Sequence, residues 1–126
     1  TSNPVIDIMM DQKGVTHKGA SMRLGEYSCS VNKKTKAHKS YMSDTIKERH
    51  RHRYEFNNNY LDQIKDKGLI ISGLNKKLNL VEMVELTDHP WFVGVQFHPE
   101  LKSRIMETHP LFNSFIKSAI KHSNEA

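Results

Sequence analysis

The apolar residues of this chain form several short runs and one long helical stripe, and this pattern constrains the fold more than any other feature. Runs at residues 5–10, 69–72, 80–86 and 91–97 have the length of strands. A helical stripe begins at Pro110, a residue suited to the first position of a helix. The pattern predicts an α/β fold, a mixed sheet with flanking helices, whose main helix carries the apolar residues Leu111, Phe112, Phe115, Ile116, Ala119 and Ile120.

The remaining segments predict shorter elements around this frame. An asparagine cap at residues 57–59 begins a short helix that ends at Gly68. The lysine-rich segment 32–39 is expected to be a solvated loop. The runs around 69–72 and 80–86 predict an antiparallel pair, and further strands are expected at residues 22–24, 27–31 and 46–56.

Length and composition narrow the class of protein. The chain has 126 residues, which suits one domain, and its formal net charge of +5 permits an anionic partner without requiring one. Its apolar runs are all shorter than the ~20 residues that cross a bilayer, so no membrane association is expected. A single cysteine, Cys29, excludes an internal disulfide and favours a reducing, cytoplasmic location.

A histidine and a glutamate follow the apolar run at residues 91–97. In extended chain, His98 and Glu100 face the same side, and Pro99 restricts the backbone between them. A carboxylate beside an imidazole orients the ring and raises its basicity, as a histidine that activates a nucleophile requires. The simpler alternative is a strand-terminating turn in which the histidine only bonds to the backbone.

Basic residues alternate along residues 48–55. If this segment is extended, its arginines share one face, which favours anions because guanidinium groups repel one another: Arg49, Arg51 and Arg53. The opposite face then carries His50, His52 and Tyr54.

Three other interpretations of this string remain open. The first is a solvated edge that pairs with acids such as Glu48 and Glu55. The second is a nucleic-acid-binding strand, although the string lacks aromatic residues between its arginines on which bases could stack. A metal pair at His50 and His52 is weaker, because the sequence places no third ligand. Cys29, in turn, lacks the flanking glycines of a nucleophile elbow and is predicted to pack in the sheet.

Several motifs together resemble the glutaminase domain of the CTP synthase family, a class I glutamine amidotransferase. The resemblance runs from about residue 5 to residue 118, and the His-Arg-His-Arg-Tyr-Glu string is its most specific part. The motifs are Met22-Arg23-Leu24-Gly25, Glu48-Arg49-His50-Arg51-His52-Arg53-Tyr54-Glu55, His89-Pro90-Trp91-Phe92, Gln96-Phe97-His98-Pro99-Glu100 and His109-Pro110-Leu111-Phe112. The resemblance implies a partial class I glutamine amidotransferase fold.

The resemblance also implies a chemistry. His98 and Glu100 match the histidine and glutamate of a Cys-His-Glu triad, in which a cysteine attacks the side-chain amide of L-glutamine, forms a thioester and releases ammonia. Arg53 matches the arginine that holds the substrate α-carboxylate. In the parent enzyme, a homotetramer, the ammonia would reach a synthase domain that uses ATP and magnesium to aminate UTP to CTP; no cofactor or metal is expected in this chain.

The family's Gly-x-Cys-x-Gly nucleophile elbow has no counterpart in this sequence. Residues 1–126 are therefore expected to form the C-terminal half of a glutaminase domain that needs the other half and the synthase domain as partners. We predict that the chain alone is inactive. The alternatives are a basic module that binds anions or nucleic acid, of which nucleic-acid binding is not expected, and an interaction domain that keeps the motifs without the chemistry.

Overall fold

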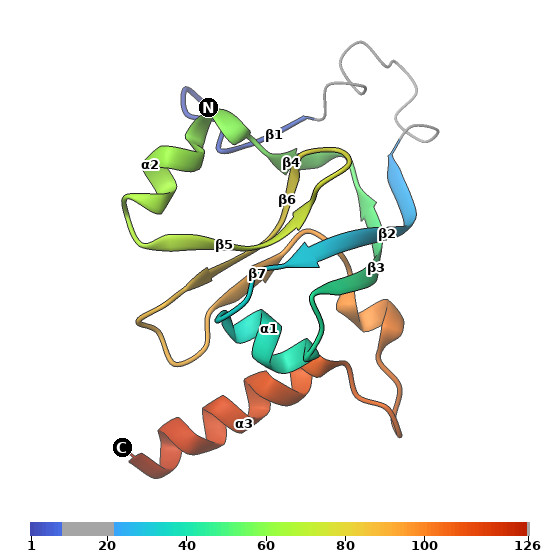
Figure 1. Cartoon of the computed structure of the whole chain (residues 1–126), viewed down its shortest axis with the longest axis vertical. Coiled ribbons are helices and arrows are strands. Elements are labelled where there is room, and N and C mark those ends of the chain that lie inside the picture. Colours follow the sequence, from blue (N-terminus) through green and yellow to red (C-terminus); the bar gives the residue numbers. More distant parts are fainter. Residues whose placement is uncertain (9–21, 126) are drawn as a thin grey trace.

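Most strands of the chain join one antiparallel sheet (Figure 1). The computed structural model describes residues 1–8 and 22–125. Five strands follow the order β3-β2-β5-β6-β7, while β1 pairs with β4 in a separate two-stranded sheet. All the described pairings are antiparallel, including the predicted β5–β6 pair, so the parallel pairing that the predicted mixed sheet requires does not occur among the described strands. The strands are β1 (Ile6–Ile8), β2 (Arg23–Val31), β3 (Thr45–His52), β4 (Tyr54–Phe56), β5 (Leu69–Asn75), β6 (Leu80–Leu86) and β7 (Val93–Val95).

Within residues 1–8 and 22–125, three helices flank the strands, as the predicted α/β class requires: α1 (Lys36–Tyr41), α2 (Leu61–Lys65) and α3 (Pro110–Glu125). Pro110 begins α3, as predicted, and Gly68 follows α2 with a φ of 88°, a backbone conformation that glycine adopts without strain. Among the described residues there are also two short 3-10 turns, η2 (Asn58–Tyr60) and η3 (Pro99–Lys102). No helix within the described residues is long and apolar enough to cross a membrane.

The expected loop at 32–39 is wrong, because α1 begins inside it. The Thr35 hydroxyl caps the helix by accepting from the His38 N–H at 3.0 Å. The first helical N–H groups, of Lys36 and Ala37, donate to the Glu85 carboxylate at 2.8 and 3.1 Å. That carboxylate comes from β6, so tertiary contact turns a lysine-rich segment into a helix.

The expected strands differ in their limits. Residues 22–24 and 27–31 lie in one continuous strand, β2, which passes through Gly25 at a φ of 100°. The expected strand at 46–56 is wrong as a single element, because it divides into β3 and β4 in different sheets. Only β7 forms within the run at 91–97, and the end of the first predicted strand, Met9 and Met10, lies outside the described residues.

The core gathers between the sheet and helices α1 and α3, which lie against each other (Figure 1). Leu111 is the buried residue of α3, whereas Phe115, Ile116 and Ile120 are 49, 54 and 57% exposed. The apolar stripe of α3 is therefore covered only at its start. The core cluster consists of Cys29, Val31, Ala37, Ile46, Met83, Phe97 and Leu111.

Candidate active site

His98 and Glu100 form a direct pair where the chain leaves the sheet. His98 follows β7 and Phe97, and Pro99 then begins η3, which brings Glu100 back towards the ring. The His98 Nδ1 and Glu100 Oε1 atoms are 2.7 Å apart, and the two side chains are 39 and 58% exposed. The backbone N–H of His98 donates to the Arg49 carbonyl at 2.8 Å, which attaches the pair to β3.

This hydrogen bond determines what the imidazole can do. The Glu100 carboxylate can only accept, so His98 Nδ1 carries the proton and, in the neutral ring, Nε2 is left as a base. The bond from His98 lowers the pKa of Glu100 below its usual range and keeps the acid ionised. The geometry is that of a base oriented by a carboxylate and open to solvent.

Arg53 lies between β3 and β4, where the chain passes from the five-stranded sheet to the two-stranded one. Its side chain is half-buried, and its buried Nε has no hydrogen-bond partner among the described residues. Arg49 and Arg51 are exposed on β3, in line with the predicted alternation. Arg53 does not continue this face, because β3 ends at His52.

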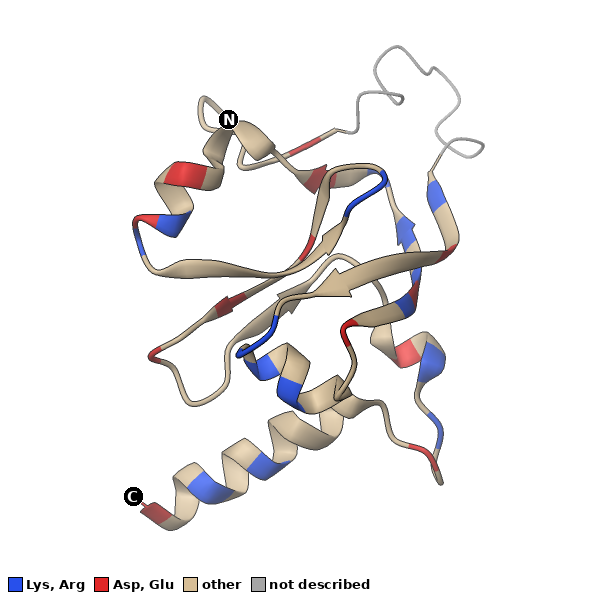
Figure 2. Ribbon diagram, in the orientation of Figure 1, with Lys and Arg blue, Asp and Glu red and all other residues tan. Residues whose placement is uncertain are grey.

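Basic residues are spread over several elements rather than gathered on β3. Figure 2 shows Lys and Arg on α1, α3, η3 and both β2 and β3, with acidic segments among them. On β3 itself, Arg49 stands opposite Glu26 of β2. The charge distribution gives no support to a nucleic-acid surface built on this strand.

Sequence reasoning missed a buried polar network beneath the site. Arg23 of β2 forms an ion pair with Glu82 of β6, and both side chains are almost completely buried. His50 is 1% exposed, and its Nε2 lies 3.6 Å from Glu82 Oε2. His50 Nδ1 is 2.8 Å from His52 Nε2, so the two rings are hydrogen-bonded to each other.

Burial controls the charges in this network. Burial, with a smaller effect from Arg23, lowers the pKa of His50 to about 3, and burial also lowers the pKa of His52. His98 contributes to both shifts, so its ring lies within electrostatic range of the two histidines. Burial raises the pKa of Glu82. One sequence signal was available: Glu82 interrupts an otherwise mainly apolar strand.

Glu48 belongs to a second buried cluster and is not the solvated acid that one interpretation required. Its Oε1 accepts from the Tyr41 hydroxyl at 2.9 Å and lies 2.9 Å from His109 Nε2. Burial raises the pKa of Tyr41, which therefore stays protonated. Because Tyr41 ends α1 and His109 precedes α3, this cluster joins both helices to β3.

Cys29 packs in the core, as predicted. Its side chain is 1% exposed, and burial raises the pKa of the thiol to about 12. A nucleophilic cysteine needs the opposite, an accessible thiol with a lowered pKa. Cys29 therefore does not complete the constellation with His98.

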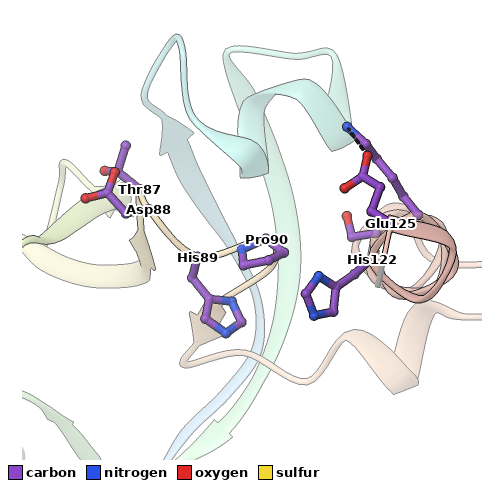
Figure 3. Close-up of a pocket in the computed structure, with 8 residues that line it drawn as sticks. Thr87, Asp88, His89, Pro90, His122 and Glu125 are labelled. Atoms are coloured by element: carbon purple, nitrogen blue, oxygen red, sulfur yellow. Dashed lines mark ion pairs between the residues drawn. The ribbon is translucent and has the colours of Figure 1, made fainter.

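The described residues contain no group of three or more metal-ligating side chains that could hold an ion. A pocket of about 450 Å³ lies elsewhere, between α3 and the loop that follows β6 (Figure 3). Its lining includes His89 and His122, and Lys121 forms an ion pair with Glu125 at 3.6 Å on its rim. None of His98, Glu100 and Arg53 lines this pocket.

Comparison with known proteins gives the family. The chain belongs to the class I glutamine amidotransferases: the family model described as "Glutamine amidotransferase class-I" matches residues 4–118. Within this family, the chain is similar to CTP synthases. It is 55% identical to the CTP synthase of Christiangramia forsetii over 98% of this chain, and 56% identical to that of Geobacter metallireducens over 96%.

A solved structure supports the same assignment. The chain superimposes on the glutaminase domain of Trypanosoma brucei CTPS, described with bound acivicin, with a TM-score of 0.82 and 36% identity. The match covers 93% of this chain and 46% of that one. The two curated relatives are much longer, since the chain spans 22% of the length of each. The predicted resemblance and fold are confirmed.

Proposed function

We propose that this chain is part of the glutaminase domain of a CTP synthase and supplies the base and the substrate clamp for glutamine hydrolysis. The observation that carries this proposal is the 2.7 Å bond between His98 Nδ1 and Glu100 Oε1, on a ring that remains accessible. Similarity to CTP synthases along nearly the whole chain supports the substrate, L-glutamine.

The geometry fits a stepwise acyl transfer. His98 Nε2 takes the proton from a cysteine thiol, and the thiolate attacks the side-chain amide carbon of glutamine. The protonated ring returns the proton to the amide nitrogen, so ammonia leaves and a thioester remains. His98 then takes a proton from water, which hydrolyses the thioester to glutamate. Glu100 holds the ring in place and stabilises its positive charge at each step.

Arg53 is proposed to bind the substrate α-carboxylate. A planar guanidinium can form two parallel hydrogen bonds with a carboxylate. The buried Nε of Arg53, which has no hydrogen-bond partner in the described part of the chain, supports this role, because it is a donor that a ligand would satisfy.

The nucleophile is proposed to come from outside these 126 residues, because the one cysteine of the chain is buried in the core. The chain matches 46% of the solved glutaminase domain, and we assign it to the C-terminal half. The half-exposed apolar residues of α3, Phe115, Ile116 and Ile120, offer a surface for the rest of the domain.

The remaining steps are assigned to the parent enzyme. Ammonia passes to a synthase domain that binds ATP, magnesium and UTP and forms CTP, in a cytoplasmic homotetramer of pyrimidine biosynthesis.

The test uses an intact enzyme that contains this chain. His98→Ala should abolish CTP formation from glutamine and leave CTP formation from added ammonium unchanged, because only the amide-opening step needs the base. His122→Ala is the matched control, since this histidine is exposed near the end of α3. Equal loss from both nitrogen sources would mean that residues 98–100 only support the fold.

A further inference from the structure

The backbone on either side of Arg53 is attached to two different sheets. His52 is the last residue of β3 and stands opposite Arg23 of β2. Tyr54 is the first residue of β4 and stands opposite Ile8 of β1. Arg53 alone connects them, so its two backbone dihedrals set the direction of its Cα–Cβ bond, from which the guanidinium extends.

One side chain bridges this one-residue connection. His52 Nδ1 lies 2.8 Å from the backbone carbonyl oxygen of Tyr54, two residues along the chain. A carbonyl oxygen only accepts hydrogen bonds, so His52 Nδ1 must be the donor. The bond closes a ring around Arg53 and joins the end of β3 to the start of β4.

The direction of this bond determines the others. In the neutral His52 ring, Nε2 carries no proton and accepts, so His50 Nδ1 donates to it across 2.8 Å. The His50 ring is enclosed by Phe97 and Tyr27, with ring centroids 5.8 and 5.3 Å away, and faces Glu82. Glu82 is held by the buried guanidinium of Arg23.

We propose that His52 is a positioning residue: its bond to the Tyr54 carbonyl fixes the connection at Arg53 and aims the guanidinium at the substrate α-carboxylate. His50 holds the His52 ring in the orientation that this bond requires. The inference rests on the proposed function, in which Arg53 binds glutamine. It assigns to the histidines of the string a role that touches no substrate atom.

Three substitutions at His52 separate this role from general stability, in an intact CTP synthase that contains this chain. The amide nitrogen of His52→Asn can occupy the place of Nδ1 and keep the bond to the Tyr54 carbonyl. The amide of His52→Gln reaches instead to the place of Nε2, towards His50. His52→Ala removes both groups.

The expected readout is the KM for glutamine. The Ala and Gln variants should raise it about three- to tenfold, the range of one lost hydrogen bond, while kcat changes less than about threefold. The Asn variant should stay near the original KM. CTP formation from ammonium should not change in any of the three.

A double substitution tests whether His52 acts through Arg53. Arg53→Lys alone should raise the KM, because a planar clamp becomes a point charge. Adding His52→Ala to Arg53→Lys should then raise it less than about twofold further, since the aim of the guanidinium no longer matters.

The outcomes distinguish the inference from the function on which it rests. An unchanged KM in Arg53→Lys would remove Arg53 from substrate binding and so overturn the proposed clamp. A raised KM in Arg53→Lys with no effect of His52→Ala would overturn the positioning role alone. Equal KM values for the Asn and Ala variants, or lost ammonium-dependent activity in all three, would also overturn it.

Discussion

Replacing Glu100 by glutamine tests how the carboxylate supports His98. The substitution keeps the shape of the side chain and one acceptor oxygen, and it removes the negative charge. A hydrogen bond to a charged group contributes about 1.5–3 kcal/mol and a neutral one about 0.5–1.5 kcal/mol, so the difference is about 1–1.5 kcal/mol. This corresponds to a loss of about five- to tenfold in kcat/KM for glutamine.

Two features of the structure keep the loss this small. The Glu100 side chain is 58% exposed, so water screens its charge and compensates part of the loss. Exposure also lets the side-chain amide introduced by Glu100→Gln rotate and present its oxygen to His98 Nδ1, so the proton of the neutral His98 ring stays on Nδ1. In the serine-protease triad, where the equivalent acid is buried, the amide substitution forces the wrong tautomer and costs about 10⁴-fold.

The assay measures the rates of CTP formation from glutamine and from ammonium in Glu100→Gln and Glu100→Ala enzymes. Glu100→Ala leaves no acceptor for His98 and should lower kcat/KM for the substrate by about tenfold or more, a larger loss than that of Glu100→Gln. Ammonium-dependent rates should match the original enzyme. A 10³-fold loss in Glu100→Gln, or identical losses in both variants, would refute the argument that an exposed acceptor keeps the ring oriented.

Three further predictions concern the core. The isolated chain should release no ammonia from glutamine; release that disappears with Cys29→Ala would make Cys29 the nucleophile. The pKa of His50 is about 3 in the folded protein and about 6.5 in the unfolded chain, so the unfolded chain binds the proton first as the pH falls. The free energy of unfolding should therefore decrease by up to ~1.4 kcal/mol per pH unit as the pH drops from about 6.5 towards 3. Ring NMR signals of His50 should therefore stay constant down to about pH 5, and a midpoint near 6.5 would contradict its burial. Gly73→Ala should cost about 1–3 kcal/mol in denaturant unfolding, because its Cβ would lie 2.8 Å from the buried Cys29 Sγ and 3.0 Å from Met83 Cγ. Gly94→Ala, with 3.1 Å to its nearest neighbour, should cost less; equal costs would show that the core adapts freely.

The parts of the fold predicted from sequence are those that local patterns specify. The apolar run at residues 80–86 has the length of a strand, and the stripe after Pro110 repeats with the period of a helix; both elements form there. The contact between His98 and Glu100 was also predicted, but the 3-10 turn that begins at Pro99 brings the two side chains together, and not the extended chain that the prediction assumed. The catalytic role of the pair stays a prediction.

Helix α1 and the buried network could not be read from local pattern. The carboxylate at the start of α1 comes from Glu85, 49 residues beyond Lys36. Arg23 and Glu82 are 59 residues apart and meet only because β5 brings β2 and β6 into one sheet. A buried charge and a solvated one look alike in a sequence, because desolvation depends on what packs around them.

The sequence by itself determined the family and the identity of the candidate residues, because these are carried by residue type and short spacing. Only the tertiary structure decided where the string at residues 48–55 divides. An alternating basic segment satisfies the period of one long strand, and pairing with β2 on one side and β1 on the other breaks it at Arg53. Register and burial arise from contacts between distant segments, so they decide that Arg49 and Arg51 are exposed on β3 while Arg53 is half-buried between the two sheets.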